Sequence, residues 1–89
     1  MNISKKTFCI GLNDKDTKTQ LIETEKAIEY VANIMVDYAG GCTITAARGY
    51  YKHEDGALCF ENTIKCEVYG MSEENALKAI EIFKASFNQ

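Results

Sequence analysis

Five residues in the second half of the chain are the candidates for chemistry: Arg48, Tyr50, Tyr51, His53 and Asn62. A guanidinium group suits a carboxylate or a phosphate, because its planar fork of donors matches two oxygens at once. In the strand pairing that the residue pattern favours, Arg48 and Asn62 fall opposite each other on an otherwise apolar face. A charge without a partner is costly there. We therefore predict a ligand-binding corner at these five residues that takes a small anion.

Arg48 and Asn62 also have a simpler interpretation. Both side chains can lie beyond the helix ends in water, or Asp14 or Asp16 of the preceding loop can neutralise the guanidinium. The same two acids are similar to the start of a calcium loop, but the other ligands of the twelve-residue pattern are missing. We expect the loop at 13–20 to be a turn with solvated charges.

Catalytic and metal chemistry find little support in the sequence. His53 is the one histidine, lies at a predicted hairpin tip and has no cysteine near it along the chain, so no nucleophile–base pair is visible. The four cysteines form no C-x-x-C pair; they are Cys9, Cys42, Cys59 and Cys66. We expect reduced, half-buried thiols, no metal, no cofactor and no enzymatic activity.

The stretch 48-RGYYKHEDG-56 begins like the aromatic motif with which RNA-recognition domains stack bases. It matches only the first three positions of that motif, falls on the second predicted strand instead of the third, and runs at once into a turn. The net charge of −3, with scattered basic residues, gives no continuous track for phosphates. Nucleic acid is therefore a disfavoured partner, and an RNA-binding module is kept as an alternative.

Hydrophobic periodicity indicates the elements that must position these residues. Alternation of apolar and polar residues predicts strands at 7–12, 42–52 and 57–69. Apolar stripes predict one helix that Thr24 caps and the glycines at 40–41 end, and a second helix that Ser72 caps. We expect a single α+β domain over 1–89 with the order β-α-β-β-α. A right-handed crossover then gives a ferredoxin-like split β-α-β arrangement, a three-stranded antiparallel-type sheet with two helices on one face.

The Asp55-Gly56 pair between the second and third strands is a strong hairpin signal. A two-residue turn would place Ile44 opposite Glu67, on the charged face. A three-residue turn, with Gly56 left-handed, pairs Ile44 with Cys66 and keeps apolar residues together. We favour the second register, because a slip by one residue moves every side chain to the other face.

The predicted sheet has one uncovered face and unpaired edges, both of which favour pairing with a second copy, so we expect a homodimer. The first residues lack the apolar run of a signal peptide, and no segment approaches the length of a membrane span. We therefore expect a cytoplasmic protein that does not enter a membrane.

Three stretches give the chain its general character: 11-GLNDKDTKTQ-20, 43-TITAARGYY-51 and 61-ENTIKCEVYG-70. Because of these three stretches, the chain resembles small single-domain proteins of phages and prophages. The resemblance implies a non-enzymatic binding module, in its most concrete form a phage-encoded inhibitor of host defence. Such a module would occlude a host protein or sequester a small anionic ligand such as a nucleotide. The alternative is a dimeric ferredoxin-like regulator or cofactor-free enzyme that acts on a small ligand.

Overall fold

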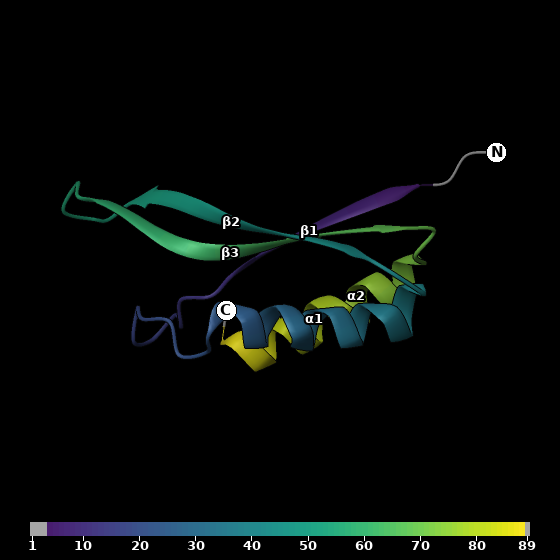
Figure 1. Cartoon of the computed structure of the whole chain (residues 1–89). Coiled ribbons are helices and arrows are strands. Elements are labelled where there is room, and N and C mark those ends of the chain that lie inside the picture. Colours follow the sequence, from purple (N-terminus) through teal and green to yellow (C-terminus); the bar gives the residue numbers. More distant parts are fainter. Residues whose placement is uncertain (1–3, 89) are drawn as a thin grey trace.

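The protein is described by a computed structural model that covers residues 4–88. Its elements follow the order β1 (Lys5–Gly11), α1 (Thr24–Ala39), β2 (Thr43–Lys52), β3 (Leu58–Tyr69) and α2 (Glu73–Phe87). β3 lies between β1 and β2 and is antiparallel to both. Figure 1 shows both helices against the same face of this sheet. The predicted α+β class, element order and three-stranded antiparallel sheet are confirmed.

The register of the β2–β3 hairpin follows from its turn. The His53 N–H donates to the Ala57 carbonyl at 2.8 Å, which leaves three residues in the turn. Gly56 has a φ of 86°, a conformation that a residue with a side chain rarely adopts. Ile44 pairs with Cys66, so the predicted register is confirmed.

The core is the layer between the sheet and the two helices. Ile64, Cys66 and Val68 of β3 point toward α1, and each is at most 1% exposed. Val31 and Met35 of α1 are fully buried against them. Burial of apolar side chains is the main favourable term in folding, and this layer supplies most of it. The other buried apolar residues are Ile10, Leu12, Ala27, Met71, Ala76, Ala79, Phe83 and Phe87.

All four cysteines are free thiols, as expected. Cys66 is fully buried, Cys42 and Cys59 are half-buried, and Cys9 is exposed. Burial, with the neighbouring thiol of Cys42 as a smaller cause, raises the pKa of Cys66 to about 12. Because the thiolate is the nucleophile, the Cys66 side chain is an unreactive part of the core.

The helix ends match the prediction in two places and differ in one. Gly40 ends α1 in a left-handed conformation with a φ of 82°, and the Ser72 hydroxyl caps α2 by accepting from the Asn75 N–H at 3.1 Å. Thr24 was expected to cap α1, but it is the first helical residue. Its hydroxyl instead accepts a hydrogen bond from the Gln20 side chain at 3.1 Å, so it serves the preceding loop.

The β2–β3 hairpin is longer than the helices that cover the sheet, and its tip projects past them (Figure 1). Leu58 and Phe60 lie on the same face of β3 as the core residues, as strand alternation predicts, but they are 71% and 54% exposed, and Tyr50 is 61% exposed. The faces were correct, but the helices end before they reach these side chains. Neither helix among residues 4–88 has the length and apolar character to cross a membrane.

Two phenylalanines test where the core ends. Replacing Phe83, which is 4% exposed, by alanine is expected to lower the free energy of unfolding by about 3–5 kcal/mol, because it opens a cavity. Phe60→Ala, the matched change in the exposed hairpin, is expected to cost less than about 1 kcal/mol. Urea unfolding of both variants measures the difference. Equal losses would contradict this boundary of the core.

Candidate functional site

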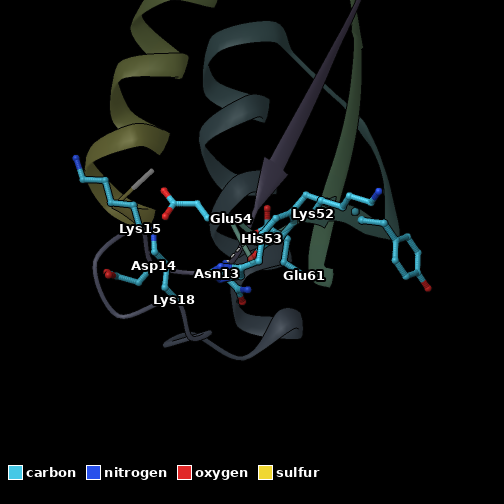
Figure 2. Close-up of a pocket in the computed structure, with 11 residues that line it drawn as sticks. Asn13, Asp14, Lys15, Lys18, Lys52, His53, Glu54 and Glu61 are labelled. Carbon is cyan, nitrogen blue, oxygen red and sulfur yellow. Dashed lines mark hydrogen bonds between the residues drawn. The ribbon is translucent and has the colours of Figure 1, made fainter. Parts of the chain in front are cut away.

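An open cavity of about 680 Å³ lies between the loop that follows β1 and the hairpin that joins β2 to β3. Figure 2 shows Asn13, His53 and Glu61 near its middle, with Lys15 and Lys52 on opposite sides. The residues that line it are Asn13, Asp14, Lys15, Lys18, Gly49, Tyr50, Tyr51, Lys52, His53, Glu54 and Glu61. Two segments far apart in the sequence thus supply its walls.

Glu61 is the acid held in place at the centre of this cavity. It lies on β3, pairs with Gly49 of β2 and points to the sheet face that carries no helix. Its Oε2 accepts a hydrogen bond from the Asn13 main-chain N–H at 3.0 Å. Within residues 4–88, no ion pair involves Glu61, and Oε1 has no hydrogen-bond partner. One carboxylate oxygen is therefore fixed and the other is free to receive a ligand.

Two glycines make room for the Glu61 side chain. A Cβ on Gly11 of β1 would collide with the Glu61 carboxylate, whose Cδ would lie 2.6 Å away. A Cβ on Gly49 would come within 3.1 Å of the Thr63 hydroxyl and 4.0 Å of Glu61 Cγ. The carboxylate therefore lies flat on the sheet, over a neighbouring backbone that carries no side chain.

The loop at 13–20 is ordered by its own hydrogen bonds. Asp14 is 8% exposed, and its Oδ1 accepts from the main-chain N–H groups of Asp16 and Thr17, both at 2.9 Å. Its Oδ2 accepts from the Asn88 side chain at 2.9 Å. The bonds from Thr17 and Asn88 hold the pKa of Asp14 below its usual range. The loop is the turn with solvated charges that we expected, since Lys15, Asp16 and Lys18 are exposed, and the buried Asp14 makes it a firm wall.

A second contact attaches this loop to the sheet. The Asn62 side-chain amide donates to Gln20 Oε1 at 2.8 Å, and Gln20 in turn donates to the Ile22 carbonyl at 2.8 Å. Asn13 and Gln20 form an isolated bridge that closes the loop. Asn62 is thus bound to the loop.

Positive and negative side chains balance in the cavity. The charged residues that line it are Lys15, Lys18, Lys52, Asp14, Glu54 and Glu61. None of its three lysines takes part in an ion pair within residues 4–88. Figure 2 shows the ammonium groups of Lys15 and Lys52 directed outward, on opposite sides of the cavity. A cavity with a central carboxylate and lysines at its rim suits a ligand that carries charges of both signs.

The structure brings together three of the five residues that the sequence indicated. Tyr50, Tyr51 and His53 line the cavity, and the rings of Tyr51 and His53 lie 6.3 Å apart. Arg48 and Asn62 pair with each other as predicted, but they are not among the lining residues. The Arg48 guanidinium lies 4.8 Å from the centre of the Phe60 ring, and within residues 4–88 it forms no ion pair. A ligand-binding role for these two residues stays a prediction.

Sequence reasoning missed Glu61. Along the sequence, Glu61 is one of several charged residues that alternate on an exposed strand face. Only the pairing register shows that it lies beside Gly11 and Gly49. The same reasoning considered Asp14 and Asp16 as a calcium site. Within residues 4–88, no group of three or more His, Cys, Asp or Glu side chains is placed to hold a metal ion.

No known protein family matches the sequence, and no curated protein is recognisably similar to it. Among solved structures, the fold matches that of a phage SAM lyase in complex with S-methyl-5'-thioadenosine, with a TM-score of 0.61. The match covers 98% of this chain and 73% of the lyase chain, at 22% sequence identity. At that identity the likeness shows a shared fold. The lyase is a phage protein, in keeping with the resemblance noted in the sequence.

This match corrects two of our predictions. We expected a non-enzymatic binding module that inhibits host defence, and we expected no enzymatic activity. The fold that we interpreted as a binding scaffold is that of an enzyme in the matching structure. We had judged enzymatic activity by the presence of a nucleophile with a neighbouring base. Covalent catalysis needs such a pair, but other mechanisms do not.

The contact between Gly11 and Glu61 can be tested directly. In Gly11→Ala the new methyl group displaces the flexible end of Glu61 and breaks its bond to Asn13, which we expect to cost about 1–2 kcal/mol of stability. Chemical denaturation should show a smaller loss when the same change is made in a Glu61→Ala background. Gly41→Ala is the control, since nothing lies within 4 Å of its added Cβ. Equal losses in both backgrounds would contradict the contact.

Proposed function

We propose that the protein is a cofactor-free enzyme that binds S-adenosylmethionine (SAM) at the Glu61 cavity and cleaves it as a lyase, releasing S-methyl-5'-thioadenosine. The observation that carries the proposal is the fold match to a phage SAM lyase over 98% of this chain. The cavity supports it independently, because its central carboxylate suits a cationic substrate.

The chemistry of SAM explains how a site with so few catalytic groups can act. Its sulfur is a sulfonium with a positive charge. When the bond to the methionine-derived carbon breaks, both electrons go to sulfur, the charge disappears and a neutral thioether leaves. The carbon fragment is completed either by loss of a proton to form a double bond or by attack of its own carboxylate to form a lactone. The leaving group is activated before it binds, so the protein mainly has to hold the reacting atoms in position.

Each wall of the cavity has a part in this proposal. The free Oε1 of Glu61 faces the sulfonium, and a charge pair in a half-buried site is stronger than one in water. Tyr51 and His53 offer ring faces to the adenine base. The lysines at the rim suit the carboxylate of the methionine part. The substrate then lies with its cationic centre over the glycines that flank Glu61.

Loss of the carboxylate tests the proposal. Wild-type protein incubated with SAM is expected to release S-methyl-5'-thioadenosine, measured by liquid chromatography with mass detection. Glu61→Gln keeps the shape of the side chain and is expected to lower kcat/KM roughly tenfold, mainly through a higher KM, because the carboxylate pairs with a positive charge that the bound substrate carries and the products lose. Glu67→Gln is the matched control, since it lies on the same strand and face but outside the cavity. Failure of the wild-type protein to release any thioadenosine would overturn the proposed activity.

Several coarser expectations fit this activity. SAM is a cytoplasmic metabolite, so we place the protein in the cytoplasm. We also propose an origin in a phage or prophage, a single domain over 1–89, and membership of the ferredoxin-like class, which the split β-α-β pairing supports.

We further propose that the protein forms a homodimer. The outer edges of β1 and β2 are unpaired within residues 4–88, and the projecting hairpin exposes Tyr50, Leu58 and Phe60. Exposed apolar side chains beside an open strand edge favour contact with another chain. Sedimentation velocity at micromolar concentration is expected to show a species of twice the monomer mass, and Phe60→Lys is expected to shift it toward monomer. A wild-type monomer under these conditions would contradict the dimer.

A further inference from the structure

The side chain at the end of α2 reaches the loop that forms one wall of the cavity. Asn88 is the left-handed residue that ends α2, with a φ of 50°. Its amide nitrogen donates to Asp14 Oδ2 at 2.9 Å and to Asp16 Oδ2 at 2.8 Å. Its main-chain carbonyl accepts from the Lys15 N–H at 3.0 Å. One residue thus makes three hydrogen bonds to three consecutive loop residues.

These bonds hold together two carboxylates that would otherwise repel each other. Asp14 and Asp16 each place one oxygen within 2.9 Å of the same nitrogen. A primary amide has two N–H donors, one for each acid. Without this amide, the two negative charges face each other and Asp14, which is 8% exposed, loses one of its hydrogen bonds. The loop would then relax away from α2.

The loop at 13–20 also fixes the Glu61 carboxylate in the cavity. Asn13 directly precedes Asp14, and its N–H donates to Glu61 Oε2 at 3.0 Å. The Asp14 N–H donates to the Thr19 carbonyl at 2.8 Å, which ties this segment to the far end of the loop. Asn88 is therefore connected to the Glu61 carboxylate by its hydrogen bond to Asp14, the peptide bond from Asp14 to Asn13, and the hydrogen bond from the Asn13 N–H to Glu61.

We infer that Asn88 is a positioning residue for Glu61: it holds the loop so that the Asn13 N–H fixes one carboxylate oxygen and leaves the other directed at the ligand. The inference rests on the proposed function for the identity of the ligand. Asn88 does not line the cavity, so it acts only through the loop. Nothing in its sequence context indicates this role, because Asn88 and Asp14 lie 74 residues apart.

The variant Asn88→Gly isolates the side chain. Glycine adopts a left-handed backbone at no steric cost, so the helix end is kept while the amide is lost. The apparent affinity for SAM, measured as KM in the thioadenosine-release assay, is expected to fall roughly threefold to tenfold, because the Glu61 carboxylate pairs with the charge on SAM. Ser86→Ala is the matched control at the same end of α2: it removes a hydrogen bond to Tyr30 but none to the loop. It is expected to leave the affinity unchanged.

A double-mutant cycle separates positioning from general destabilisation. In a Glu61→Gln background, Asn88→Gly is expected to change the affinity by less than roughly twofold, because the group that it positions is already altered. An equal loss in both backgrounds would show that Asn88 does not act through Glu61.

Hydrogen exchange gives a readout that needs no ligand. Asn88→Gly is expected to speed exchange of the Asn13 amide, whose protection reports its bond to Glu61. If the wild-type protein does not cleave SAM but this protection falls, the proposed function fails and the positioning role stands. If the wild-type protein cleaves SAM but Asn88→Gly changes neither affinity nor exchange, the positioning role is overturned and the proposed function stands.

Discussion

The pairing register of β2 with β3 is the constraint on which the rest of the structure depends. Side chains on a strand alternate between faces, so the register decides both which side chains are buried in the core and which lie on the uncovered face. With Ile44 opposite Cys66, the apolar residues of β3 meet α1, and Glu61 falls beside Gly49 on the uncovered face. A shift by one residue would place charges in the core and remove the acid from the cavity. Stability and site geometry are therefore two consequences of the same turn at Gly56.

The candidate site combines a rigid sheet with a loop that the sheet alone does not determine. Glu61 and Gly49 are placed by strand pairing, whereas Asn13 is placed by hydrogen bonds within the loop and to α2. A site of this kind needs both parts to agree within a few tenths of an ångström. The acids Asp14 and Asp16 therefore have a structural role, and the acid available to a ligand is a different one.

Periodicity and turn chemistry were sufficient to predict the element order, the sheet topology and the register, because local pattern and global pairing agree in this chain. The exposure of Leu58 and Phe60 could not be predicted, since strand pattern says nothing about how far the helices reach. Glu61 was missed for a related reason: its importance comes from Gly11, which is 50 positions away in the sequence and beside it in space. The absence of a visible nucleophile–base pair did not decide the question of activity, because catalysis without a covalent intermediate does not need one.

The central position of β3 also has a consequence for how the protein folds. β2 and β3 are joined by a short turn and can pair as soon as both are synthesised, while β1 must wait for a partner that lies far along the chain. The bond between Asn13 and Glu61 spans 48 residues and can form only when β1 docks on the finished hairpin. The cavity is thus among the last parts of the molecule to assemble. A nascent or partly folded chain therefore lacks the cavity until the whole sheet is closed.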